Sequence, residues 1–208
     1  MPHNYVIASE SIQPSILFDR SDPVLKRELL RKVGRLRMNS QLQPWEMITR
    51  LQTLIRDKVP HAGNEVSVHK NPNAYTLFNA KRMNADGVAR LGEYLRVGKA
   101  VCREQAFLTH VALLTAGFEA RLVTGLLDSD HGPIGAHVWN EAKVDGRWQI
   151  VDTTNRDFNG SDPGQAASGG IHGYYFRPSK QQYRIVPQTD FVKARALSKL
   201  LEREGRID

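Results

Sequence analysis

The sequence predicts an α+β domain in which a helix that begins at Cys102 packs against an antiparallel sheet. Apolar side chains recur at helical spacing after Cys102 as far as Gly117, and glycine is a common helix terminator. Further along, two runs rich in β-branched and aromatic residues are joined by Asp145-Gly146, a dipeptide typical of two-residue hairpin turns. Because such turns join antiparallel strands, the helix and this hairpin define the predicted fold class.

Two helices are predicted before the cysteine. Ser21-Asp22-Pro23 places a capping residue before a proline at a helix start, and apolar residues then recur at helical spacing over 22–38. Pro44 opens a second amphipathic run that stops at Pro60. We therefore expect residues 1–60 to form a helical N-terminal extension and residues 61–208 to form the core domain.

Short elements are expected on both sides of the cysteine. Val66 and Val68 alternate with polar residues, which indicates a short strand. The spacing of apolar residues over 85–95 indicates a helix that Gly98 ends. A further strand is expected through 121–125, between the cysteine helix and the hairpin.

After the hairpin, the expected order is a loop, strands and a terminal helix. Residues 157–173 are rich in Gly, Ser, Asp and Pro, which predicts a flexible surface loop. Residues 174–186 are strand-like, and 189–205 predict a helix capped by Thr189 or Asp190.

Composition excludes several classes of protein. The 208 residues include one cysteine, so no internal disulfide can form, and no Cys or His spacing fits a structural zinc site. The chain does not open on a basic and apolar leader, and no apolar run approaches the roughly 20 residues of a membrane span. We therefore expect a cytoplasmic protein with no metal, cofactor or membrane span, with export by a signal-less route left open.

The formal net charge of +7 is partly concentrated in residues 26–37. Two interpretations remain open for this basic stretch: the solvated face of an amphipathic helix, or a patch that binds an acidic partner. Nucleic acid is the less favoured partner.

Spacing within the hairpin brings a histidine and a carboxylate to one face. If Asp145-Gly146 is a two-residue loop, counting outward places Trp139 opposite Asp152 and His137 opposite Thr154. His137 and Asp152 are then diagonal neighbours on one face, within reach of each other, whereas a one-residue slip would separate them. Asp152 is expected to hold Nδ1 of His137, which leaves Nε2 free to take a proton from a thiol.

Cys102 fits this arrangement as a nucleophile. A helix N-terminus presents unpaired N–H groups and a partial positive charge, which stabilise a thiolate. A lone cysteine is more often a small buried hydrophobe. The nearby base and carboxylate favour the functional interpretation over that one.

The run GKAVCREQAFLTHVALLTAGFEARLVTGLL, followed by AHVWNEAKVDGRWQIVDTT, resembles the core of the transglutaminase-like superfamily over roughly residues 85–156. Gly98 before the cysteine and the order Cys, His, Asp carry the resemblance. It implies a papain-like α+β core. It also implies Cys102 as nucleophile, His137 as general base and acid, and Asp152 as the residue that orients His137.

The implied activity is acyl transfer through a thioester on peptide bonds or glutamine carboxamides of a protein or peptide substrate. The resemblance leaves peptidase, deamidase and transglutaminase reactions open. The superfamily also includes copies without activity. The alternative function is therefore a catalytically silent binding module that uses the basic helix 26–37 to bind an acidic partner or nucleic acid.

An oxyanion needs two donors, and the Cys102 N–H can be only one of them. Relatives usually take the second donor from a side chain upstream. Tyr75, Asn79 and Trp45 are the candidates, although each is more easily explained as structural. Trp139 is expected to flank the site and to contact substrate.

Overall fold

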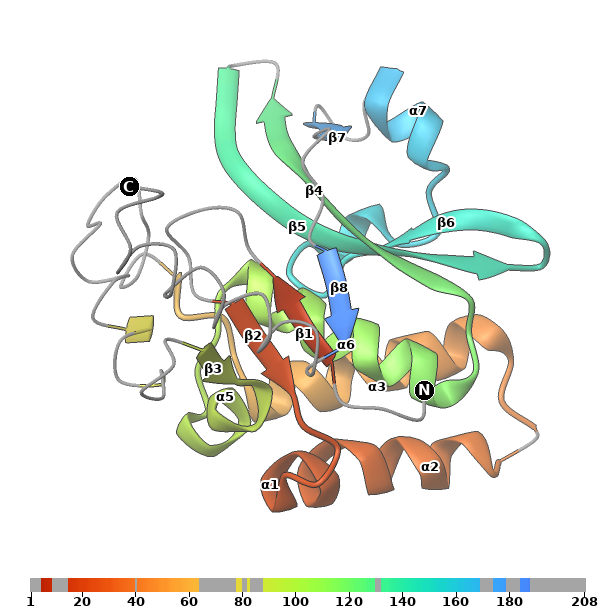
Figure 1. The fold of residues 1–208 in the computed structure, drawn as a ribbon. Coiled ribbons are helices and arrows are strands. Elements are labelled where there is room, and N and C mark those ends of the chain that lie inside the picture. The colour runs from red at the N-terminus through yellow and green to blue at the C-terminus, as the bar shows by residue number, and fades with distance from the viewer. Residues whose placement is uncertain are drawn as a thin grey trace, which may run out of the picture.

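The computed structural model describes residues 5–8, 15–39, 41–63, 78–79, 82, 88–129, 132–168, 174–178 and 184–187. Helix α6 (Cys102–Ala116) lies at the centre, between the larger of two four-stranded sheets and two N-terminal helices (Figure 1). The fold class is therefore the predicted one, a cysteine-bearing helix on an antiparallel sheet. The strand predicted at Val66 to Val68 and the terminal helix predicted at 189–205 lie outside the described residues.

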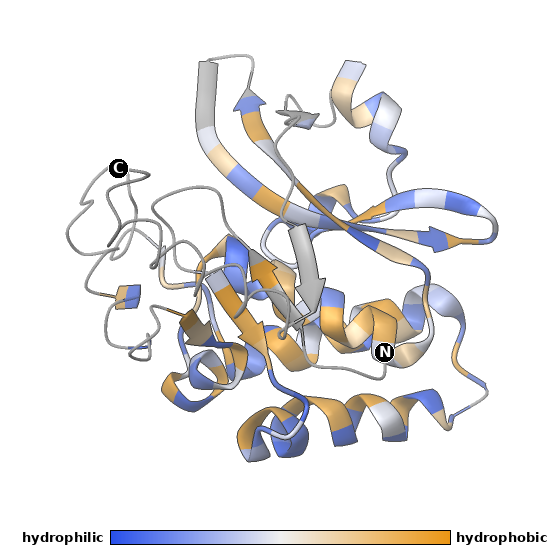
Figure 2. Ribbon diagram, in the orientation of Figure 1, coloured by the Kyte–Doolittle hydropathy of each residue, from blue (hydrophilic) through white to orange (hydrophobic). Residues whose placement is uncertain are grey.

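Helix α6 begins and ends where the sequence predicts. Its residues 103–113 are all buried, because β-strands cover one side and helices cover the other. Figure 2 shows mainly hydrophobic colours along it. A helix buried on all sides must satisfy its polar side chains internally. Thr109 accordingly shares a 2.6 Å hydrogen bond with Thr153, and Gly117, with φ of 99°, terminates the helix.

The larger sheet has the strand order β6-β5-β4-β7 and is antiparallel throughout. Its strands are β4 (Ala120–Ser129), β5 (Gly132–Val144), β6 (Arg147–Val151) and β7 (Tyr174–Pro178). Asp145 (φ 50°) and Gly146 (φ 78°) form the turn between β5 and β6, and both have the positive φ that this turn requires. Val144 pairs with Arg147, so the predicted hairpin register is confirmed.

The N-terminal helices match the prediction with one addition. Asp22 caps the first helix by accepting the N–H groups of Val24 (2.8 Å) and Leu25 (3.0 Å). The helix then contains one π-type turn, in which Arg31 N–H bonds to the Lys26 carbonyl five residues back. The elements are α1 (Pro23–Leu25), η1 (Lys26–Leu30), α2 (Arg31–Arg37) and, after a turn, α3 (Pro44–Lys58).

The expectation of a helical extension over residues 1–60 is corrected. Residues 5–8 and 15–18 are strands of a second sheet with the order β3-β2-β1-β8. Its strands are β1 (Tyr5–Ala8), β2 (Ser15–Phe18), β3 (Val88–Arg90) and β8 (Arg184–Pro187). Strand pairing thus ties the N-terminus to segments far along the chain, and Val33, Ile48 and Leu51 pack in one core with α6. Such long-range pairing leaves no signal in a local pattern.

Two further predictions are corrected in their bounds. The helix expected over 85–95 is α5 (Leu91–Val97), because residues 88–90 pair with β2 instead; Gly98, with φ of 70°, ends it as predicted. The loop expected over 157–173 contains η3 (Arg156–Phe158) and α7 (Pro163–Ser168) in its described part. Phe158 and Ala166 are buried in a small apolar cluster under the sheet, which explains this order. None of the helices in the described ranges is long and apolar enough to cross a membrane.

Candidate active site

Cys102 is the first residue of α6, and its side chain is half-buried. The next two residues fix this helix turn. Glu104 accepts the Val101 N–H through Oε2 (3.1 Å) and pairs through Oε1 with the Arg103 guanidinium (2.6 Å). Both charged side chains are buried, and breaking such a pair from one side is costly. The pair therefore anchors the turn that presents the thiol.

His137 on β5 and Asp152 just after β6 are in direct contact, with 2.6 Å between Nε2 and Oδ2. Both side chains are buried. The other carboxylate oxygen, Oδ1, accepts the N–H groups of Thr154 (2.8 Å) and Asn155 (3.0 Å). Both oxygens of the carboxylate are thus bonded. The contact between His137 and Asp152, which the hairpin register predicted, is confirmed.

The ring nitrogen that contacts Asp152 differs from the prediction. Asp152 was expected at Nδ1, but it lies at Nε2. Nε2 is the ring nitrogen farther from the backbone, so it is the one that spans the diagonal to the neighbouring strand. His137 also interacts with the Cys102 side chain.

The electrostatics favour a charged pair. Burial raises the pKa of the Cys102 thiol, but hydrogen bonds with His137 and His61 outweigh burial and lower this pKa from 9.0 to about 6. Burial lowers the pKa of His137, whereas the charge and hydrogen bond of Asp152 and the contact with Cys102 raise it from 6.5 to about 10. Between these two values the sulfur is deprotonated and the imidazole protonated, as a thiolate–imidazolium pair requires.

Gln105 joins the cysteine helix to two other segments near the site. It is buried on α6, three residues after Cys102. Its amide nitrogen donates to the Val59 carbonyl (2.9 Å), and its amide oxygen accepts the Thr154 hydroxyl (2.9 Å). The cysteine helix is thereby bonded both to the segment after Asp152 and to the chain just before His61.

Two amide side chains, Asn159 and Gln52, support the backbone at Asp152. Asn159 Oδ1 accepts the backbone N–H of Asp152 (2.8 Å), and its amide nitrogen donates to Gln52 on α3 (2.9 Å). Gln52 returns a hydrogen bond to Asn159 Oδ1 (3.2 Å). An N-terminal helix therefore helps to position Asp152, although it lies far away in the sequence.

His61 is a site residue that the sequence did not reveal. It forms a parallel bridge with Ala100, and the Ala62 N–H donates to the Ala100 carbonyl (2.7 Å), so the segment runs beside the entry to α6. The Gly63 N–H donates to His61 Nδ1 (2.9 Å), which places the ring proton on Nε2. That nitrogen is the one available for the hydrogen bond between His61 and Cys102. The only sequence signal was a histidine after a predicted helix end.

The candidates for a second oxyanion donor make other contacts. Trp45 Nε1 donates to Gln149 Oε1 (2.9 Å), and Asn79 accepts the Tyr94 hydroxyl (2.9 Å) while buried. Tyr75 lies outside the described residues. The contacts of Trp45 and Asn79 suit a structural role.

Trp139 lies beside the site, as expected from the register. Its ring is nearly parallel to that of His137, with 6.1 Å between centroids and 16° between planes. Its side chain is only 1% exposed, so it packs beside the imidazole within the core. Direct contact between Trp139 and substrate stays a prediction.

The histidine, cysteine and aspartate side chains of the site are arranged for proton transfer. Within the part of the chain that the structure describes, no three His, Cys, Asp or Glu side chains are grouped as metal ligands. His137 and His61 each have a ring nitrogen engaged by the protein, and both residues lower the pKa of Cys102.

Comparisons with known proteins give one family. The sequence profile of the transglutaminase-like superfamily matches residues 35–153, which include Cys102, His137 and Asp152. A search of curated protein sequences gave no significant match.

Three solved structures are among those that a structural comparison matches to this chain. One is a protein from Cytophaga hutchinsonii described as a candidate cysteine protease (14% identity, 80% of this chain and 52% of that chain, TM-score 0.43). Another is described as a TGase (11% identity, 85% and 47%, TM-score 0.49). The third is calcium-bound LapG of Legionella pneumophila (12% identity, 77% and 88%, TM-score 0.34). This chain spans about half the length of the first two.

Proposed function

We propose that this chain, which belongs to the transglutaminase-like superfamily, is an enzyme that transfers acyl groups through a thioester on Cys102. One observation supports the proposal: His137 bonds Asp152 (2.6 Å), and Cys102, at the N-terminus of a buried helix, interacts with His137 strongly enough to lower the pKa of the thiol. This is the nucleophile, base and orienting group that acyl transfer needs.

In the proposed first step, the Cys102 thiolate attacks the carbonyl carbon of a peptide bond or glutamine carboxamide. A carbon–sulfur bond forms, and the π electrons of the carbonyl move to oxygen. The tetrahedral intermediate collapses, the carbon–nitrogen bond breaks, and protonated His137 gives its proton to the leaving nitrogen. The product is an amine or ammonia and a thioester on Cys102.

In the second step, neutral His137 takes a proton from an incoming water or amine, which attacks the thioester carbon. Sulfur then leaves as the thiolate, and the imidazolium is restored. Water gives peptide hydrolysis or glutamine deamidation, and a primary amine gives transamidation. Asp152 keeps the proton of His137 on Nε2, so that Nδ1 can exchange protons at the sulfur.

His61 is proposed to supply the second donor to the oxyanion. Residues at a helix start have N–H groups without an intrahelical partner, so the Cys102 N–H is one donor. His61 carries its proton on Nε2, the nitrogen that bonds Cys102. When the sulfur loses its charge to the substrate, the same N–H can follow the charge to the carbonyl oxygen.

One assay separates the three reactions. The protein is incubated with a glutamine-rich protein such as casein, with and without a fluorescent primary amine. Amine incorporation, ammonia release and new N-termini are then measured. We expect one of the three products to form, and none to form after iodoacetamide has alkylated the single cysteine. Absence of all three products across several protein substrates would contradict the proposal.

Replacement of His61 tests its role as a donor. We expect His61→Ala to lower kcat on the order of 10²-fold with little change in KM, as expected for loss of one oxyanion donor. His61→Gln keeps an N–H donor and should recover part of kcat. If His61→Ala keeps the wild-type kcat, or if His61→Gln is as slow as His61→Ala, the donor role is wrong.

A further inference from the structure

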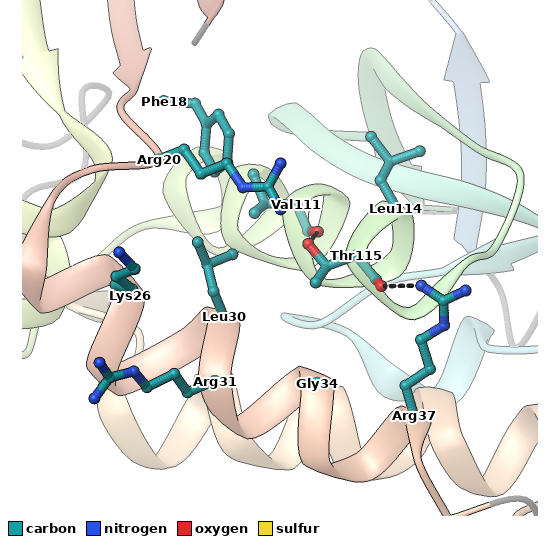
Figure 3. A pocket seen from close by; sticks show the side chains of 10 residues that line it. All are labelled: Phe18, Arg20, Lys26, Leu30, Arg31, Gly34, Arg37, Val111, Leu114 and Thr115. Atoms are coloured by element: carbon teal, nitrogen blue, oxygen red, sulfur yellow. Dashed lines mark hydrogen bonds between the residues drawn. The ribbon is translucent and has the colours of Figure 1, made fainter. Parts of the chain in front are cut away.

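A cavity lies away from Cys102. It has a volume of about 400 Å³ and lies between the first N-terminal helix and the far half of α6 (Figure 3). The α6 residues that line it are Val111, Leu114 and Thr115. At 1.5 Å per residue they lie roughly 14–20 Å along the helix axis from Cys102. The cavity is therefore a separate feature from the proposed active site.

The charged residues around the cavity all have one sign. Among the residues that the structure describes, Arg20, Lys26, Arg31 and Arg37 line it, and no carboxylate does. Among the described residues, neither Lys26 nor Arg31 forms an ion pair, and one Arg37 nitrogen contacts only the Thr115 carbonyl (3.4 Å). The positive charges of Lys26, Arg31 and Arg37 around one hollow would be balanced by an anionic occupant.

The π-type turn contributes to this arrangement. In an α-helix, side chains five residues apart point to different sides. The turn between Lys26 and Arg31 bonds residues five apart, and both residues line the cavity. Such turns frequently occur at functional sites. The sequence pattern of a regular amphipathic helix would have separated these two charges.

The floor of the cavity is apolar and recessed. Phe18 and Val111 are buried, and Leu30 and Leu114 are partly buried. Gly34 leaves the space open on the helix side, since a Cβ built there meets nothing within 4 Å. Figure 3 shows Gly34 across from Thr115, with the cations around the rim.

We propose that this cavity binds an acidic peptide segment that inserts one apolar side chain between the two helices. The rim cations would pair with its carboxylates, and the recessed floor would take a leucine or phenylalanine. A nucleic acid is less well matched, because the only aromatic ring in the lining, Phe18, is buried and offers no face for base stacking. A flat lipid surface does not reach a floor that lies below the rim.

Anisotropy of a fluorescein-labelled heptapeptide, with acidic residues on both sides of a Leu-Phe pair, tests the proposal on the full chain. We expect saturable binding that weakens as salt is added. Lys26→Glu and Arg31→Glu should each raise Kd by about tenfold or more. Gly34→Met should raise Kd similarly, because it fills the cavity without removing a charge.

Three control variants separate the cavity from general effects. Gly34→Ala adds only a methyl group, and Arg56→Glu makes the same charge change on α3, away from the cavity; both should bind like the wild type. Cys102→Ala should also bind the peptide normally, so this proposal can hold even if the proposed enzymatic function fails. Equal binding by wild type and Gly34→Met would overturn the proposal. So would tighter binding of a single-stranded oligonucleotide or of phosphatidylserine vesicles that Gly34→Met abolishes.

Discussion

Asp152→Asn should lower kcat/KM on the order of 10²–10⁴-fold while leaving the fold intact. The reason lies in the three hydrogen bonds that this side chain makes. Oδ1 accepts two backbone N–H groups, from Thr154 and Asn155, and Oδ2 faces Nε2 of His137. An asparagine must keep its oxygen toward the two backbone donors, so its NH₂ group faces the imidazole. Nε2 then becomes an acceptor, the ring proton moves to Nδ1, and His137 can no longer take a proton there.

Two measurements accompany the rate. Circular dichroism should match the wild type, since the substitution is isosteric and keeps both backbone hydrogen bonds. The alkaline limb of the pH–rate profile should move to lower pH, because the Asp152 charge is a main cause of the raised pKa of His137. A variant with wild-type kcat/KM, or with an unmoved alkaline limb, would show that Asp152 does not orient His137.

His137→Ala should remove both the base and the stabilised thiolate. We expect kcat/KM to fall on the order of 10²–10⁴-fold from loss of general acid–base catalysis. The thiol should also become less reactive toward iodoacetamide at pH 6. With a pKa near 6, half of the wild-type thiol is ionised there, against about a thousandth at an ordinary pKa of 9.0. A thiolate of lower pKa is about 20-fold less nucleophilic, so the net fall in alkylation rate is about 25-fold.

The wild-type pH dependence gives the sign of both shifts. Activity should rise with deprotonation of Cys102 near pH 6 and fall with deprotonation of His137 near pH 10, with a plateau between them.

The alkylation experiment has its own control. The wild type and the His137→Ala variant should be alkylated at the same rate in denaturant, which shows that the reagent itself does not distinguish them. An equal alkylation rate in the folded wild type and the folded His137→Ala variant at pH 6 would refute the ion pair.

The catalytic hairpin shows how much of the site follows from residue order. Asp145-Gly146 determines a two-residue turn, and the turn determines which residues of β5 and β6 share a face. The contact between His137 and Asp152 therefore could be predicted without a structure. So could the start of α6 at Cys102 and its end at Gly117, since capping and termination are local effects.

The second sheet shows where local reasoning stops. Nothing within residues 5–18 indicates that these short apolar runs pair with 88–90 and 184–187. The predicted helical extension was therefore incomplete, and part of the helix predicted over 85–95 was wrong. The segment after Asp152 was also misread, because its polar composition predicts a loop while Phe158 and Ala166 are buried. Burial against distant strands outweighs local propensity in each case.

Residue order over a short hairpin and one helix is enough to derive the nucleophile, the histidine and the carboxylate, because each of those relations spans a few residues and obeys a fixed period. Packing alone decides that Nε2 rather than Nδ1 contacts Asp152, and that His61 reaches Cys102 from a segment 41 positions away. It also decides that four cations gather around one hollow. These features depend on contacts between segments that meet only when the core closes, so no local pattern encodes them.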